Sequence, residues 1–209
     1  MVTDDARILD AKACQLEGWI VRFEESTEAW LVPACNPFGG VELAFGGARS
    51  YSHGQSEFAH AYAQAKTVLR ELETDGWGAG LAVGTFREVH RPAGSGWPGD
   101  MYVNGILSKS FFGDAWVAHV NLGAGYERDN RRTIPTWGFG HEIRVREDFH
   151  FLPEMFAADR GRPFYQMSVR FALTKDLLLD ASIGDRINTG GGERWYSIGF
   201  HYQTPPFIP

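Results

Sequence analysis

The feature that most constrains this chain is an alternation of apolar and polar residues with period two, repeated in ten stretches between Gly39 and Gln203. Successive side chains of a β-strand point to opposite faces, so each stretch is predicted to form a strand with one apolar and one polar face. Strands cross lipid only as closed barrels, because an open sheet edge would leave backbone groups unpaired there. The pattern therefore predicts an all-β protein, a closed, antiparallel, up-and-down transmembrane β-barrel.

The stretch from Ser56 to Glu71 indicates which face meets which surroundings. One parity is small and apolar, with alanine at 59, 61, 63 and 65, whereas the other is large and polar. A soluble sandwich would need the large set to be apolar, because bulky apolar side chains fill its core. We therefore assign the small set to lipid and the large set to a lumen. The next stretch, residues 76–88, places glycines on its lumen parity, where long neighbouring side chains can lie over them.

Aromatic residues on the outward parity are predicted to mark the membrane interfaces. Trp116 and Tyr126 are ten residues apart on one face. At about 3.3 Å per residue and a tilt near 40°, this separation is roughly 25 Å, the height of an outer-membrane apolar band. The interface candidates are Trp77, Trp116, Tyr126, Trp137, Tyr165, Tyr196 and Tyr202.

The connections between the stretches are expected to alternate in length. Outer-membrane barrels pair short periplasmic turns with longer external loops. The predicted long loops are residues 50–55, 90–99, 127–133, 158–162 and 187–193, and the predicted short turns are residues 72–75, 113, 147 and 175–176.

Residues 1–38 are either a further hairpin or a separate plug. A hairpin register that sets Cys14 opposite Cys35 also sets Trp19 opposite Trp30. A Cys14–Cys35 disulfide would then close the hairpin at its open end, as suits the oxidising periplasm. Two unpaired cysteines in a reducing cell are the alternative, and a zinc site would have only half its ligands. The hairpin raises the total to about twelve strands, while ten strands with the hairpin inside or beneath them remain an alternative.

Composition fits one domain over residues 1–209, with the main barrel at 39–203 and a tail at 204–209. No apolar run approaches the roughly 20 residues of a transmembrane helix. The acidic start of the chain is not a signal peptide, so we expect that a native signal was removed. A natively complete chain would instead favour a cytosolic β-rich protein. The net charge of -6 argues against nucleic acid as a partner.

Three segments carry a resemblance to known sequences. Residues 33–37 with the strand that follows, residues 76–85 and residues 161–166 resemble stretches of small Gram-negative outer-membrane β-barrel proteins, an uncharacterised proteobacterial group. The resemblance covers most of the chain and implies a barrel in the bacterial outer membrane, without an activity. One departure is the tail, since a final-strand aromatic is commonly the last residue, whereas here Tyr202 is followed by seven more. The tail is expected to fold back into the barrel mouth or to bind a partner.

Function is to be sought among the side chains assigned to the lumen. They are Glu42, His60, Lys66, Arg70, Glu88, His119, Glu127, Glu142, Arg144, Arg146, His150, Glu154, Arg170, Asp180, Arg186 and His201. Paired across strands, they would form a salt-bridged filling. Left open, they would line a narrow channel or cavity in which the five arginines attract small anionic solutes.

The leading hypothesis is thus a narrow porin-like passage or a filled-lumen scaffold in the outer membrane. A partner-binding structural barrel, using its external loops or its tail, is the alternative. Lys109, His141 and the alanine face of residues 59–65 would suit a contact between subunits.

A lipid-modifying enzyme is less favoured, because Ser110 and Ser197 have no obvious histidine nearby and no Gly-x-Ser-x-Gly motif is present. His141 lies on the apolar parity of its strand, and Asp185 lies outward near a strand end, where lipid headgroups are expected. The four lumen histidines lack a diagnostic metal-binding spacing. We therefore predict no cofactor and no enzymatic activity.

Overall fold

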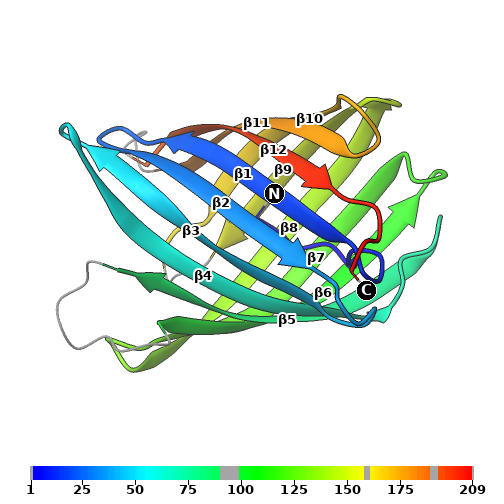
Figure 1. Cartoon of the computed structure of the whole chain (residues 1–209), viewed down its shortest axis with the longest axis horizontal. Coiled ribbons are helices and arrows are strands. Elements are labelled where there is room, and N and C mark those ends of the chain that lie inside the picture. Colours follow the sequence, from blue (N-terminus) through cyan, green and yellow to red (C-terminus); the bar gives the residue numbers. More distant parts are fainter. Residues whose placement is uncertain (1, 90–98, 158–160, 189–192, 209) are drawn as a thin grey trace.

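The computed structural model of the protein describes residues 2–89, 99–157, 161–188 and 193–208. Within these ranges twelve antiparallel strands close into a barrel (Figure 1). The strands are β1 (Cys14–Arg22), β2 (Thr27–Cys35), β3 (Glu42–Ser52), β4 (Gln55–Arg70), β5 (Trp77–Glu88), β6 (Asp100–Phe111), β7 (Trp116–Glu127), β8 (Arg132–Arg146), β9 (Phe149–Ala157), β10 (Phe164–Ala172), β11 (Leu177–Arg186) and β12 (Trp195–Gln203). No helix in the described ranges is long and apolar enough to span a membrane.

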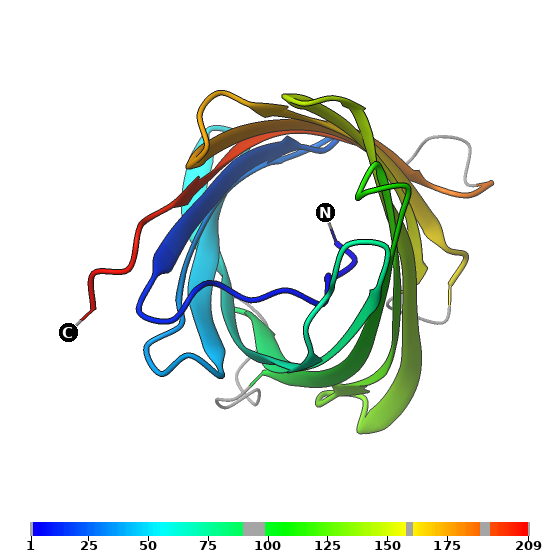
Figure 2. The same cartoon turned by 90° about the vertical axis from the view of Figure 1, so that its right-hand side faces the viewer.

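Each strand pairs with its neighbours in sequence, and β1 pairs with β12 to close the ring. The predicted up-and-down barrel of twelve strands is confirmed. Because the number of strands is even, β1 begins and β12 ends at the same end of the barrel, which we call the terminal end. Figure 2 looks into the barrel from this end.

The N-terminal hairpin is part of the wall. β1 and β2 pair in the predicted register, with Cys14 opposite Cys35 and Trp19 opposite Trp30, and the two cysteines form a disulfide. Because the other edge of β1 bonds to β12, the ten-strand alternative is wrong. Residues 2–13, ahead of the hairpin, turn into the lumen (Figure 2).

The outer face of the barrel carries exposed apolar side chains on every second residue. Leu69 is 73% exposed, Leu122 63% and Ile198 65%, values that are costly in water but suited to lipid. The interface candidates share this outward parity, and Trp77, Tyr126, Tyr196 and Tyr202 are among the exposed side chains. The other three, Trp116, Trp137 and Tyr165, are half-buried.

The predicted loop at residues 50–55 is wrong. β3 continues to Ser52 and β4 begins at Gln55, so only His53 and Gly54 connect them. Both residues have positive φ, 51° and 77°, as a tight two-residue hairpin turn requires. Loop length therefore does not alternate throughout. Residues 90–98, 158–160 and 189–192, within three predicted long loops, lie outside the described residues.

Glycines on the lumen face make room for large side chains, as expected. The ring of Tyr102 on β6 lies against Gly84 on β5, where an added Cβ would overlap it. The Tyr102 hydroxyl reaches across and donates a 2.6 Å hydrogen bond to Gln64 on β4. The large side chains that lie over lumen glycines therefore come from β6 as well as from β4.

Candidate functional site: a plugged lumen

The N-terminal segment lies inside the barrel, and we call residues 2–13 the plug. The chain runs within the ring of strands and its N-terminus lies inside that ring (Figure 2). Contacts of the plug reach seven consecutive strands, from β3 to β9. The plug is therefore an integral part of the lumen.

Its first residues are held by their main-chain groups. The amides of Val2 and Thr3 donate to the carboxylate of Glu154, at 2.8–3.0 Å. Asp4 and Asn121 are joined twice, since the Asp4 amide donates to Asn121 Oδ1 at 2.7 Å and Asn121 Nδ2 donates to the Asp4 carbonyl at 2.9 Å. Such contacts recognise an extended backbone rather than particular side chains.

The middle and base of the plug follow the same rule. The Ala6 amide donates to Ser108 Oγ at 2.9 Å, and the Leu9 amide donates to Glu42 Oε2 at 3.0 Å. The Leu9 carbonyl accepts a 2.7 Å hydrogen bond from Asn36 Nδ2, just beyond β2. Leu9 and Ala13 also pack in an apolar cluster with side chains of β2 and β3.

Ion pairs add side-chain recognition. Lys66 Nζ lies 3.0 Å from Asp5 and 3.6 Å from Asp4. Arg7 lies 3.1 Å from Glu142 and 3.3 Å from Asp5. Because only 9% of the Lys66 side chain is exposed, its amine depends on the plug for its charge partners.

Three wall residues beneath the plug form a Ser–His–Glu series. His119 Nδ1 and Ser108 Oγ share a 2.8 Å hydrogen bond, and His119 Nε2 lies 3.6 Å from Glu142. Ser108 and His119 are almost fully buried, and Ser108 also accepts the Ala6 amide. The series supports the plug through the Ser108 hydroxyl, which lies buried against it.

On the opposite side of the lumen, polar groups pair within the wall. Arg170 on β10 binds Asp180 on β11 through two hydrogen bonds, of 2.7 and 2.9 Å. His201 Nδ1 lies 2.9 Å from Glu17. The carboxylate of Asp180 and that of Glu17 thus find partners on adjacent strands without the plug.

An aromatic ladder lines the lumen towards the end away from the termini. Trp19 stacks on Trp30 with ring centroids 5.4 Å apart, and Trp30 stacks on His60 at 5.3 Å. Phe86 continues the ladder, 5.1 Å from His60. Glu28 bonds both Trp30 Nε1 and His60 Nε2, at 2.8 and 3.1 Å. The ladder holds four strands in one relative position and packs against the apolar base of the plug.

The predicted lumen residues thus fall into separate groups. Those around the plug are Glu42, Lys66, His119, Glu142 and Glu154; those paired within the wall or in the ladder are His60, Arg170, Asp180 and His201. His150 on β9 lies opposite Arg144 in register and also opposite Arg170. Glu127 binds Arg132 at 2.6 Å, at the end away from the termini.

The five arginines are not brought together as one cluster. Arg70, Arg144 and Arg146 lie at strand ends near the terminal end and bind the Trp77 carbonyl, the Gly113 carbonyl and Asp148 respectively. Arg186 lies at the other end, where it pairs with Glu193 and stacks on Phe164. Each arginine therefore has its own partner.

The four lumen histidines also stay apart. His60, His119 and His201 bind Glu28, Ser108 and Glu17 in turn. In the part of the chain that the structure describes, no group of three or more His, Cys, Asp or Glu side chains is arranged to hold a metal ion.

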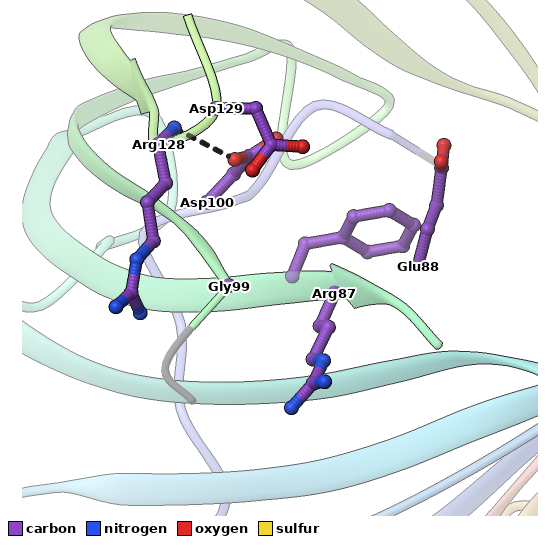
Figure 3. A pocket seen from close by; sticks show the side chains of 7 residues that line it. Arg87, Glu88, Gly99, Asp100, Arg128 and Asp129 are labelled. Carbon is purple, nitrogen blue, oxygen red and sulfur yellow. Dashed lines mark hydrogen bonds between the residues drawn. The ribbon is translucent and has the colours of Figure 1, made fainter. Parts of the chain in front are cut away.

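A small pocket opens at the end away from the termini (Figure 3). Its lining combines both charge signs, and the main-chain amide of Arg128 donates to Asp100 Oδ1 at 2.9 Å. The lining residues are Phe86, Arg87, Glu88, Gly99, Asp100, Arg128 and Asp129. Of these, only Glu88 was among the predicted lumen residues.

Several residues singled out in the sequence serve local structure. His141 accepts a 3.2 Å hydrogen bond from Trp116 Nε1 on the outer face. Lys109 donates to the Asp75 carbonyl at 2.6 Å. Asp185, expected among headgroups, is only 4% exposed and binds Arg194 at 3.2 Å. The missed anchors Ser108 and Asn121 share the lumen parity of their strands, which was the available signal.

The tail bonds to the base of the plug. The amides of Phe207 and Ile208 both donate to the Lys12 carbonyl, at 2.9 and 3.1 Å, and the Thr204 amide donates to the Cys14 carbonyl at 2.8 Å. The tail thus lies along the corner where the plug leaves the wall.

The architecture is shared with proteins of known structure. No curated protein sequence matches the chain. Among solved structures it is similar to the KdgM porin in complex with disordered oligogalacturonate (9% identity, TM-score 0.66, 90% of this chain and 98% of that chain covered) and to the NanC porin (10%, 0.66, 90% and 98%). It is also similar to the COG4313 outer membrane channel from Pseudomonas putida F1 (10%, 0.64, 98% and 100%).

At such identities the likeness concerns the fold alone, which is that of outer-membrane porins and channels. The sequence itself matches a family model over residues 1–203. The chain belongs to the family described as "Uncharacterised conserved protein UCP029691".

Proposed function

We propose that the protein resides in the bacterial outer membrane and forms a narrow, porin-like passage for small solutes. The observation that carries this proposal is the opposition of the two faces of one closed wall. Most outward side chains are apolar and many of them are exposed, whereas the inward face carries charged and hydrogen-bonded groups. A barrel with this distribution is stable in lipid and can offer a polar path through it.

The fold shared with porins and with an outer membrane channel supports the same proposal. The KdgM porin forms a complex with oligogalacturonate, an acidic oligosaccharide. An anionic solute is therefore our secondary proposal for this chain. It has less support from the lumen, because the five arginines already have partners.

The first experiment is refolding into detergent, followed by a gel of boiled and unboiled samples. A compact, heat-modifiable band is expected, and folding in plain buffer would overturn the membrane assignment. Bilayer recordings of the refolded protein then test the passage. Cation-selective reversal potentials would overturn the anion preference alone.

A filled scaffold is the second candidate, and the plug favours it, because it satisfies buried wall groups from β3 to β9. We propose no enzymatic role, since the Ser108–His119–Glu142 series is covered by the plug. Absence of current from a folded protein whose plug has been removed would favour the scaffold.

A further inference from the structure

We propose that the lumen wall beside the plug is a binding track for an extended peptide, that residues 2–13 are its resident ligand, and that their release opens the passage. This inference rests on the proposed function for its last step only. The site and its occupant are both visible in the structure.

The wall binds the main chain of a peptide. Glu154, Asn121, Ser108 and Glu42 each accept main-chain amides, in the order in which the plug passes them. Main-chain amides are common to all peptides, so these acceptors would take any extended peptide that reaches them. Glu154 and Glu42 are 5% and 8% exposed, and a vacant track would leave both carboxylates without these donors.

The track also binds charged side chains of the peptide in a fixed order. Lys66 binds acidic side chains at plug positions 4 and 5, and Glu142 binds the basic side chain of Arg7. A preferred peptide therefore carries an acidic pair followed by a basic residue. Solutes without amides or with the opposite charge order should compete poorly.

The plug is fixed firmly only at its base. Leu9 and Ala13 pack against Val32, Ala34 and Ala44, close to the point where the chain joins β1 at Cys14. Residues 2–7 are held by hydrogen bonds and ion pairs, and their one apolar cluster joins Ala6 to Ala82 and Ile106. Release is thus expected to begin at residue 2 and to stop at Leu9.

The test uses a variant that lacks residues 2–8 but keeps the base of the plug. Refolded protein is compared with the full chain in planar bilayers. We expect the fraction of time spent open to rise about tenfold or more, the change that a shift of roughly 1.4 kcal/mol between two states gives. A synthetic peptide with the sequence of residues 1–8 should then block the variant's current saturably, whereas a scrambled peptide of the same composition, which lacks the charge order, should need about tenfold more peptide for the same block.

A matched pair of point variants covers the case in which the deletion fails to fold. Glu154→Gln removes the charge that binds the Val2 and Thr3 amides, and should raise the open fraction severalfold. Asp185→Asn removes an equally buried carboxylate that lies on the outward parity and binds Arg194, and should leave the open fraction unchanged. Heat-modifiability on gels verifies that each variant is folded.

Peptide binding is also measured without current, as the fluorescence anisotropy of labelled peptide with the deletion variant in detergent. Specific binding without any conductance would support the track and overturn the passage. Equal open fractions above zero in the full chain and the folded deletion variant would overturn release of the plug, while the passage would stand. Equal binding or block by the scrambled peptide would overturn recognition of the charge order, and no binding of either peptide would overturn the track itself.

Discussion

Charged side chains on two sides of the same lumen are paired in different ways. On β10 and β11, Arg170 lies opposite Asp180 in register and binds it directly. On β3 and β4, Glu42 lies opposite Lys66 in register, yet Lys66 binds Asp5 and Glu42 accepts the Leu9 amide. On the first side the charged groups find partners within the sheet, whereas on the second side their partners come from the plug, which is not part of the sheet. A cross-strand pair of opposite charges is therefore not enough to infer a salt bridge.

The largest effect is expected from Lys66→Met on the plugged side. The substitution removes an amine that is almost fully buried and that pairs with two carboxylates at once, those of Asp4 and Asp5, so we expect a cost of about 3 kcal/mol. The temperature at which the compact band is lost on unboiled gels measures it. A loss no greater than that of Arg170→Met would remove the distinction between the two sides.

Trp30→Ala tests the aromatic ladder, which lies between the two sides. Trp30 stacks on Trp19 and His60 and packs against the base of the plug. Because the ring is half-buried, we expect a loss of about 2–3 kcal/mol. The same thermal assay measures it, with Trp137→Ala on the outer face as the control. Equal losses in the two variants would mean that the stacked ladder adds nothing beyond a ring on the barrel.

Arg170→Met sharpens the comparison from the side that lacks the plug. It leaves Asp180 unpaired, but the two side chains are 24% and 28% exposed, so water can replace part of the lost contact. A loss of about 1–2 kcal/mol is expected. The plug should stay in place, so bilayer recordings of this variant should show no rise in open fraction. Such a rise would indicate that the two sides are coupled.

The smallest effect is expected at a turn that belongs to neither side. Hydrogen bonds from Ser110 and Thr74 hold the pKa of Asp114 below its ordinary value. A carboxyl group with a lowered pKa contributes stability above its ordinary value near 3.8, and that contribution disappears as pH falls through the folded pKa. Asp114→Asn should therefore reduce thermal stability slightly at pH 7 and by less near pH 2. An equal loss at both values would rule out titration of Asp114 as the cause.

Much of the wall could be predicted from the sequence. Strand parity alone separates the two faces, and the spacing of Cys14, Trp19, Trp30 and Cys35 specifies the register of the first hairpin. These features depend on local periodicity and on pairs close in sequence, which a single chain displays directly. The two-residue turn at His53 was not predicted, because histidine and the serines around it are typical of loops and hid the strands that continue on both sides.

The plug could not be predicted in the same way. Residues 2–13 have no period-two pattern, and their partners lie far along the chain, with a sequence separation of 152 for Val2 and Glu154. The only signal was complementary charge, acids at 4 and 5 and a base at 7 against Lys66 and Glu142. The arginine cluster failed for a related reason, because parity gives the face of a residue but not its height or its partner.

The seam between β1 and β12 constrains the order in which this molecule can assemble. Gln15 pairs with Gln203, so the ring closes only once nearly the entire chain has been made. Contacts between residues so distant in sequence form late, because the loss of chain entropy on closing a long loop must first be offset. The plug is attached to β1 and contacts strands as far along as β9. If it docks before the seam forms, it can serve as a template around which the middle strands gather.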